Sequence, residues 1–206
     1  MISLFIDTSD KNLIITLLKD SKKIDFINME NIKNMSSELL SNLSSMCTNN
    51  NINIKDVNKV YVVNGPGSFT GIRIGVTVAK TIAYCLNIPI VTLSSLEVLA
   101  STSDSDIICS LIDARRSYVY AGVYDNNLNV MYEDKYILLD TLLDSLKEKN
   151  VTFVSNYTFE GLNIIKPNIN IEKIISKHIN DETKNSHNVN PNYLKLTEAE
   201  ENRKND

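Results

Sequence analysis

A β-branched run, Val60–Val63, leads into a glycine-rich turn and then into a long apolar stretch that ends near Leu86, and this segment constrains the fold more than any other. Gly65 and Gly67 permit positive φ angles or the close approach of another backbone. Pro66, which lies between them, stiffens the turn. The segment therefore predicts a strand, a glycine turn and a helix in direct succession.

The start of the predicted helix has features of an anion site but fits neither common nucleotide motif. Ser68 or Thr70 can cap the helix, and free N–H groups at a helix start can hold a phosphate. A Walker P-loop is excluded because no Lys-Ser or Lys-Thr pair comes directly after Gly71. The dinucleotide pattern is excluded because its third glycine comes one residue late. We treat the turn as one motif, made of Gly65, Pro66, Gly67, Ser68, Phe69, Thr70 and Arg73.

Very small residues recur every four positions along the predicted helix and form a ridge: Gly71, Gly75, Ala79 and Ala83. Two glycines inside a helix cost about 1 kcal/mol each relative to alanine, so something should compensate for them. The rest of the circumference is mostly apolar, which is typical of a helix buried on more than one side. Such a helix could be enclosed within its own domain. We favour the alternative that one face packs on the parent sheet and another binds a partner protein.

Composition describes an ordinary globular protein and argues against several classes. The 206 residues carry a net charge of −4, which does not suit a strongly electrostatic nucleic-acid binder acting alone. Cys47, Cys85 and Cys109 are odd in number and far apart, so we expect reduced core thiols in a cytoplasmic protein. The chain opens on a strand-like run without a signal-peptide pattern. No apolar segment approaches the length of a membrane span, and we expect no membrane contact.

The first half of the chain has the element order of a known α/β unit. Alternating apolar patterns predict strands over 2–6, 12–18 and 22–29, followed by an amphipathic helix over 36–47. The strand at 60–63, the helix that ends near 86 and a strand over 90–93 complete the half. Three strands, a helix, a strand, a helix and a strand form the ribonuclease-H-like unit of actin-type ATPase folds. We therefore expect a first lobe over residues 1–102.

The second half repeats the first in a shorter form after a polar linker at 101–105. Strands are predicted over 107–112, 118–124 and 130–136, then a helix over 138–149 and a strand over 151–154. The fold class expected for the whole chain is α/β, an actin-like fold with two ribonuclease-H-like lobes. We expect the second lobe, 103–196, to be reduced and residues 197–206 to form a frayed tail. The polar segment 172–187 has no clear assignment.

In each half the first strand ends in an aspartate: Asp7, followed by Thr8 and Ser9, and Asp113, followed two residues later by Arg115. In actin-type folds such turns place an aspartate and small hydroxyl side chains near nucleotide phosphates. An arginine can also bind a phosphate bidentately. Each signal alone is equally typical of a residue that caps a turn or points into solvent. Both interpretations stay open.

Metal and hydrolase chemistry have little support in the sequence. His178 and His187 are the only histidines, they lie in the most polar region of the chain, and no cysteine is near them. No Gly-x-Ser-x-Gly elbow of an α/β-hydrolase is present. We therefore expect no metal and no catalytic triad.

Several stretches together resemble the bacterial TsaB (YeaZ) family. The glycine motif reads Gly-Pro-Gly-Ser-Phe-Thr-Gly-Ile-Arg-Ile-Gly from Gly65 to Gly75 and is highly specific in this context. Residues 76–80, 86–91 and 93–97 continue the similarity. Further matching stretches lie at 6–9, at 113–115 before Val119-Tyr120, and at 191–195. The similarity is dense over residues 1–125, sparse from 126 to 190, and returns at 191–195.

The resemblance implies a role in forming N6-threonylcarbamoyladenosine at position 37 of ANN-decoding tRNAs. Members of the family look like degenerate paralogues of the catalytic subunit TsaD, with which they pair, and the small ATPase TsaE joins the complex. TsaD carries a metal held by a His-x-x-x-His pair, and alignment puts Ser95 and Leu99 at those two positions. Because a serine and a leucine cannot hold a divalent metal there, we expect a non-catalytic scaffold or activator.

The resemblance also implies that pairing uses two helices of the first lobe. The partner interface is then expected to consist of Leu39, Leu43, Gly71, Gly75, Ala79 and Ala83. TsaD is the expected direct partner, TsaE joins in the complex, and tRNA is contacted indirectly. The free chain could form a homodimer through the same apolar face. We expect no cofactor of its own, with ATP or ADP at the interface of the complex.

The sequence departs from the family pattern at three places. Met35-Ser36 stands where His-Ser is usual, and Lys195 stands where arginine is usual. Residues 155–158 replace a glycine-rich turn of the second half, which weakens the case for an intact nucleotide cleft. An active actin-fold ATPase or phosphotransferase remains the alternative function, supported by the two aspartate turns. A metallopeptidase fails for lack of metal ligands.

Overall fold

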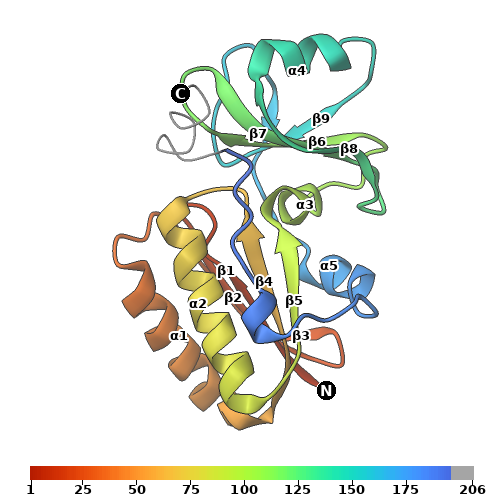
Figure 1. Cartoon of the computed structure of the whole chain (residues 1–206). Coiled ribbons are helices and arrows are strands. Elements are labelled where there is room, and N and C mark those ends of the chain that lie inside the picture. The colour runs from red at the N-terminus through yellow and green to blue at the C-terminus, as the bar shows by residue number, and fades with distance from the viewer. Residues whose placement is uncertain (196–206) are drawn as a thin grey trace.

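The computed structural model describes residues 1–195, and in this part the strands form two five-stranded sheets, one in each lobe (Figure 1). Helices cover the sheets, and the short helix α3 (Ser95–Ala100) lies between the lobes. The predicted frayed tail, residues 197–206, lies outside the described residues. The chain therefore has the two-lobed organisation that its two similar halves predict.

The first sheet has the strand order β3-β2-β1-β4-β5. The strands β1, β2 and β3 are antiparallel neighbours, whereas β4 and β5 run parallel to β1. Each strand contains a run that the sequence predicted, but β4 is longer than the predicted 60–63. The bounds are β1 Ile2–Asp7, β2 Leu13–Lys19, β3 Lys22–Met29, α1 Met35–Asn49, a 3-10 turn Ile54–Asp56, β4 Val57–Gly65, α2 Phe69–Leu86 and β5 Ile90–Ser94.

The second sheet repeats the first, with the order β8-β7-β6-β9-β10. Its first three strands are antiparallel and its last two are parallel to β6, as in the first lobe. This shared topology confirms the predicted actin-like fold built from two ribonuclease-H-like lobes. The bounds are β6 Ile108–Asp113, β7 Tyr118–Tyr124, β8 Val130–Leu138, α4 Leu139–Leu146, β9 Thr152–Val154, β10 Ile164–Ile165, α5 Ile171–Lys177 and a 3-10 turn Ser186–Asn188.

Three apolar clusters hold the layers together. The first lies between the first sheet and the helices α1 and α2. The second joins the opposite face of that sheet to α3, α5 and the facing side of the second sheet. The third lies between the second sheet and α4. Because the middle cluster draws on both sheets, the two lobes share part of one core.

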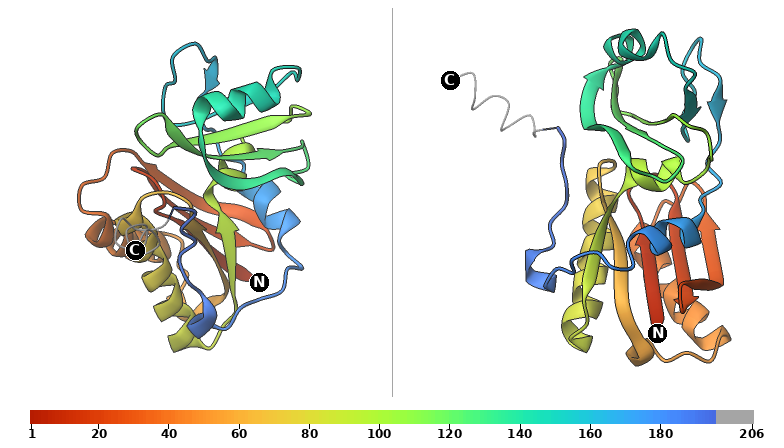
Figure 2. Two further views of the ribbon diagram at one scale, coloured as in Figure 1. Left: turned by 45° about the horizontal axis from the view of Figure 1, so that its top comes forward. Right: turned by 90° about the vertical axis from the view of Figure 1, so that its right-hand side faces the viewer.

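The end of the described chain returns to the first lobe. The helix α5 lies across the first sheet (Figure 2), where Ile171, Ile174 and Ile175 are buried. Lys184 then forms a bridge to β5, and Val189 is fully buried in the core beneath α2. The expected second lobe, 103–196, therefore needs a correction, because most of the segment from Ile171 to Val189 packs on the first lobe. Apolar residues spaced through a polar segment gave too weak a pattern to predict this.

Two smaller expectations also need correction. Cys85 is exposed on α2, so it is not a core residue, whereas Cys47 and Cys109 are buried. The sequence predicted no apolar segment long enough to span a membrane. By length and composition alone, α2 is nevertheless long and apolar enough to do so. Its fully buried residues, however, belong to the core between the helix and the first sheet, as expected for a core helix. The apolar character of α2 thus has an explanation in the fold.

The small-residue ridge of α2 faces the chain's own sheet and not a partner. A Cβ atom added to Gly71 would overlap the carbonyl oxygen of Thr8, and one added to Gly75 would overlap the Thr8 hydroxyl. Ala79 and Ala83 are also buried, at 0% and 1% exposure. The expectation that this ridge forms a partner interface was therefore wrong. The missing side chains let α2 approach β1 closely, and this contact compensates for two glycines in a helix.

We predict that Gly75→Leu destabilises the monomer by about 3 kcal/mol, because the new side chain must displace Thr8, which directly follows β1. Thr77→Leu, on the exposed side of the same helix, is the matched control and should change stability by less than about 0.5 kcal/mol. Urea unfolding followed by circular dichroism measures both. A Gly75→Leu variant as stable as the unmodified chain would contradict the close contact.

Candidate functional site

The side chain of Asp7 is held by hydrogen bonds from its own turn. The strand β1 delivers its carboxylate to the space between the lobes, where the side chain is 8% exposed. Its Oδ1 accepts hydrogen bonds from the backbone N–H of Ser9 at 2.8 Å and from the Ser9 hydroxyl at 2.6 Å. The Thr8 hydroxyl points the other way and donates to the Gly71 carbonyl in α2. Of the predicted turn Asp7-Thr8-Ser9, only Asp7 and Ser9 therefore face the cleft.

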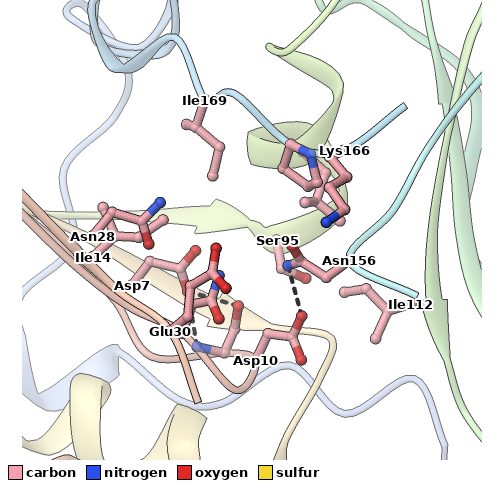
Figure 3. Close-up of a pocket in the computed structure, with 14 residues that line it drawn as sticks. Asp7, Asp10, Ile14, Asn28, Glu30, Ser95, Ile112, Asn156, Lys166 and Ile169 are labelled. Atoms are coloured by element: carbon pink, nitrogen blue, oxygen red, sulfur yellow. Dashed lines mark hydrogen bonds between the residues drawn. The ribbon is translucent and has the colours of Figure 1, made fainter. Parts of the chain in front are cut away.

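A small cavity of about 80 Å³ remains beside Asp7 between the lobes. Its walls include Asn28 and Glu30 from the first sheet, Ser95 from α3, and Lys166 from the segment after β10 (Figure 3). Pockets that bind ligands of nucleotide size usually measure about 300 Å³ or more. The cavity is therefore too small for a nucleotide in this conformation.

The cleft is closed by a clamp between the lobes, which we define as Asp10, Asn156 and Tyr157. The two carboxylate oxygens of Asp10 accept from the Asn156 amide at 2.9 Å and from the Tyr157 hydroxyl at 2.5 Å. Lys11 reaches across to the same loop and lies 5.1 Å from the centre of the Tyr157 ring. Residues 155–158 thus supply two side chains that join the lobes beside the cavity.

Burial raises the pKa of Asp7 to about 6, and this effect outweighs the hydrogen bonds from Ser9, which lower it. The carboxylate is consequently ionised at neutral pH at a cost in folding free energy. No metal-binding group of three His, Cys, Asp or Glu side chains occurs among residues 1–195. The cavity has the polar lining of a nucleotide cleft without the space for its ligand.

Ser95 and Leu99, which the resemblance puts at the positions of a metal-binding pair, lie one turn apart on α3 and line the cavity beside Asp7. Both are almost fully buried. The Ser95 hydroxyl donates to the carbonyl of Pro66 and so ties α3 to the glycine turn. The two side chains therefore serve packing and turn geometry.

The second aspartate turn lies outside the cavity. Asp113 is exposed, and its Oδ1 accepts from the backbone N–H of Arg115 at 2.9 Å. Arg115, Arg116 and Ser117 all have positive φ angles, of 67°, 52° and 63°. Both arginines are exposed. The structure thus does not bring Asp7 and Asp113 together around one ligand.

The glycine turn shows why its residues are small. Gly65 and Gly67 have φ angles of 123° and 149°, and a Cβ on Gly67 would overlap the carbonyl of Ser9. Ser68 caps α2 as predicted, since its side chain accepts from the Gly71 N–H at 3.2 Å. The turn therefore fastens α2 to the aspartate turn of β1.

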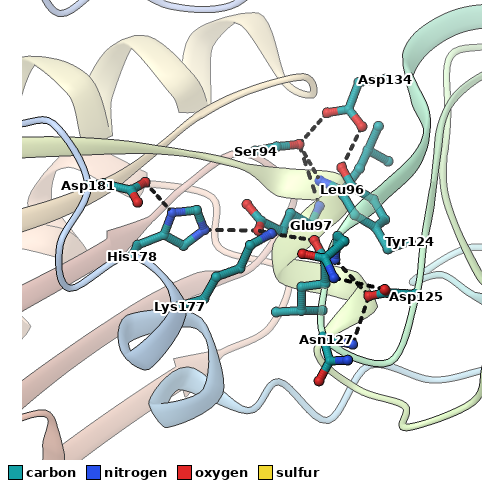
Figure 4. Close-up of polar contacts among 12 residues, drawn as sticks. Ser94, Leu96, Glu97, Tyr124, Asp125, Asn127, Asp134, Lys177, His178 and Asp181 are labelled. Atoms are coloured by element: carbon teal, nitrogen blue, oxygen red, sulfur yellow. Dashed lines mark hydrogen bonds and ion pairs between the residues drawn. The ribbon is translucent and has the colours of Figure 1, made fainter.

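Polar contacts that the sequence did not reveal fix the lobes at the opposite side of α3 (Figure 4). The carboxylate of Asp134 in the second lobe accepts from Tyr124 and from Ser94 at the end of β5, each at 2.5 Å. Lys177 of α5 bonds the carbonyl of Leu128 in the second lobe. No motif marks the two contacts between the lobes, because Ser94 and Asp134 are 40 residues apart and Lys177 and Leu128 are 49 apart.

The Lys177 ammonium also forms an ion pair with the buried carboxylate of Glu97 in α3, with 2.6 Å between Nζ and Oε1. His178 lies between Glu97 at 2.9 Å and Asp181 at 2.5 Å. Burial would raise the pKa of Glu97, but hydrogen bonds from His178 and Lys177 outweigh it and lower the pKa. Burial would lower the pKa of His178, but its two carboxylate neighbours raise it. This cluster stabilises the contact between α3 and α5.

The outer face of α1 and α2 carries apolar side chains that the described chain leaves uncovered. Leu40 is 55% exposed and Phe69 is 43% exposed. Two grooves of about 420 Å³ each run along this face. The first is lined by residues such as Thr77 and Val78, the second by residues such as Leu40 and Ile82. We call this surface the outer helix face.

Leu39 was expected in the partner interface but does not lie on the outer helix face, whereas Leu43 is almost fully buried and still lines the second groove. They are 0% and 6% exposed and belong to the core between α1 and the first sheet. The periodic pattern identified the helix correctly, but it marked the face that packs inward. The isolated Leu40 beside that pattern was the signal for the exposed face.

In comparisons with known proteins, this chain is similar to proteins of tRNA threonylcarbamoyladenosine biosynthesis. Residues 29–201 match the model of a family described as TsaD, tRNA N6-adenosine threonylcarbamoyltransferase. The chain is 34% identical to the tRNA threonylcarbamoyladenosine biosynthesis protein TsaB of Bacillus subtilis, over 97% of this chain and 96% of that protein. It is 28% identical to TsaB of Buchnera aphidicola (subsp. Schizaphis graminum), over 81% and 89%.

Solved structures support the same fold. YeaZ from Pseudomonas aeruginosa superposes with a TM-score of 0.76 over 94% of this chain and 99% of that chain, at 18% sequence identity. A second structure, described as an uncharacterised protein with similarity to peptidase YeaZ from Pseudomonas aeruginosa, gives a TM-score of 0.80 with the same coverage and identity. At this identity the match establishes the fold alone.

We predict that Asp7→Asn stabilises the protein above pH 6. The raised pKa means that the stability contribution of protonated Asp7 is fully present below pH 3.8 and is lost as the pH rises through 6. An asparagine keeps the acceptor for Ser9 and removes the charge, so the gain at pH 8 should approach about 3 kcal/mol.

Urea unfolding of Asp7→Asn at pH 4.5 and pH 8 tests this, with Asp113→Asn at the exposed turn as control. The stability difference between Asp7→Asn and the unmodified chain should grow with pH, while that of the control stays near zero. A constant difference would show that burial of the Asp7 charge is not costly.

Proposed function

Because this chain belongs to the TsaB family of tRNA threonylcarbamoyladenosine biosynthesis proteins, we propose that it acts as a non-catalytic subunit that pairs directly with TsaD through the outer helix face. In this role it activates threonylcarbamoyl transfer to adenosine 37 of ANN-decoding tRNAs. TsaE joins the resulting complex, and tRNA is contacted mainly by the partners. The proposal also places the protein in the cytoplasm, where tRNA is modified.

The absence of catalysis by this chain alone is supported by the side chains at its cleft. Ser95 and Leu99 offer no ligands to a divalent metal, and both are committed to packing. The clamp on Asp10 leaves about 80 Å³ beside Asp7. These features weigh against the alternative, an active actin-fold ATPase or phosphotransferase. A nucleotide bound to the complex would then lie at its interface and not in this cleft.

The outer helix face carries the pairing proposal. It presents exposed Leu40 and Phe69 and two grooves in one region, whereas isolated exposed apolar residues need no explanation. Helices with such grooves commonly bind the apolar side of another helix. When TsaD is absent, the same face would pair two copies of this chain.

Reconstitution of the modification reaction tests the function. The cognate synthase, TsaD, TsaE, tRNA, threonine, bicarbonate and ATP are combined with and without this chain, and threonylcarbamoyladenosine is measured by mass spectrometry. We expect product only when the chain is present. Equal product without it would overturn the activator role, and ATP hydrolysis by the chain alone would favour the alternative.

We predict that Leu40→Glu and Thr77→Glu each weaken pairing with TsaD at least about tenfold, because each places a charge in an apolar groove. Both residues are exposed, so the monomer should keep its stability. Leu138→Glu, at an exposed leucine of the second lobe, is the matched control. Calorimetric titration with purified TsaD measures the affinities. Unchanged affinity in both groove variants would remove this face from the interface.

A further inference from the structure

Arg73 on the outer helix face is held in position by two aromatic side chains. Its guanidinium carbon lies 3.8 Å from the centre of the Phe69 ring, one turn earlier on α2. Its Nε donates a hydrogen bond of 2.8 Å to the hydroxyl of Tyr193, from the returning end of the chain. The Phe69 and Tyr193 rings also stack, with centres 4.8 Å apart. The three side chains form one ordered cluster on the surface.

These contacts hold the exposed side chain of Arg73 in one conformation. A free arginine side chain samples many rotamers, and fixing them on binding costs up to about 2 kcal/mol. In the cluster the stacking contact sets the plane of the guanidinium, and the Nε bond sets its direction. Much of that entropic cost has therefore been met before any ligand arrives.

The two terminal nitrogens of Arg73 are the part of the group left available. Among residues 1–195, no carboxylate lies within salt-bridge distance of Arg73. These nitrogens carry parallel N–H donors, whose spacing matches the two oxygens of a carboxylate. Arg73 also lines the apolar groove that contains Thr77 and Val78. The cluster thus combines a cationic fork with an apolar surface beside it.

We propose that Arg73, positioned by Phe69 and Tyr193, is a carboxylate-binding anchor at the rim of the pairing surface, and that its ligand is an aspartate or glutamate on an apolar helix of the protein partner. This inference rests on the proposed pairing with TsaD and adds the chemistry of one contact. It also gives the returning chain end a function, because Tyr193 brings that end to the partner surface.

A protein carboxylate fits the surroundings better than an RNA phosphate. Arg73 is the one cation among the described residues that line this groove, and the groove walls are mostly apolar. Phosphate backbones are bound by clusters of lysine and arginine, whereas an amphipathic helix supplies apolar side chains with a single acidic residue beside them.

The test compares affinities for purified TsaD by calorimetric titration at 50 mM and 300 mM salt. Arg73→Met should weaken binding about tenfold or more, since a charge-assisted bidentate pair is lost. Arg73→Lys should recover little, because lysine has neither the fork nor the stacking plane. Tyr193→Phe keeps the ring but removes the acceptor for Nε, so a loss of about threefold is expected for a positioning residue.

Arg116→Met, at an exposed arginine of the second lobe, is the matched control and should bind normally. The salt dependence of binding should also fall in Arg73→Met and persist in the control. Unfolding midpoints of all variants should equal that of the unmodified chain, because Arg73 and Tyr193 are exposed.

Three outcomes would overturn the anchor. If Arg73→Met binds within twofold of the unmodified chain while Leu40→Glu loses affinity, pairing stands and the anchor fails. If Arg73→Met keeps its affinity for TsaD but the assembled complex loses affinity for tRNA, the ligand is a phosphate. If the unmodified chain does not bind TsaD, the proposed function fails and the anchor fails with it.

Discussion

The rest of the structure depends on the contact between α2 and β1, in which two glycines meet backbone and hydroxyl atoms of Thr8. Because α2 lies so close to the sheet, the glycine turn before it reaches Ser9 and fixes the aspartate turn beside the cleft. In this close packing, the glycines and alanines of the ridge on α2 all face the sheet. Ile72 and Val76 pack inward beside them, whereas apolar side chains on the other side of the helix, such as Phe69, stay exposed. This exposed surface is the one that suits a partner.

The two lobes of this chain are joined by side-chain hydrogen bonds on both sides of α3. Asp10 is bonded to Asn156 and Tyr157 on one side of α3, and Ser94 is bonded to Asp134 on the other. An actin-type fold keeps its aspartate turns, but here only Asp7 remains beside a cavity of about 80 Å³. A small cavity and an exposed apolar outer face together support the proposal that the protein works by binding another subunit.

Much of the fold could be predicted because local patterns define its elements. The duplicated order of strands and helices predicted both lobes, and the glycine motif predicted where α2 begins. The direction of the ridge on α2 could not be predicted, since a helix that is apolar on most sides carries no signal for which side packs inward. The clamp was equally hidden, because Asp10 and Tyr157 are 147 residues apart and have no shared motif. The return of α5 was missed for a similar reason: its apolar residues are few within a polar segment.

Hydroxyl-radical footprinting of this chain, alone and with TsaD, tests the central claim most directly, because it reports the exposure of individual side chains. We predict that oxidation of Leu40 and Phe69 on the outer helix face falls strongly when TsaD is added. Met131 and Tyr132, which are 45% and 37% exposed on β8 of the second lobe, should be oxidised as before. Protection of Met131 and Tyr132 without protection of Leu40 and Phe69 would contradict the account.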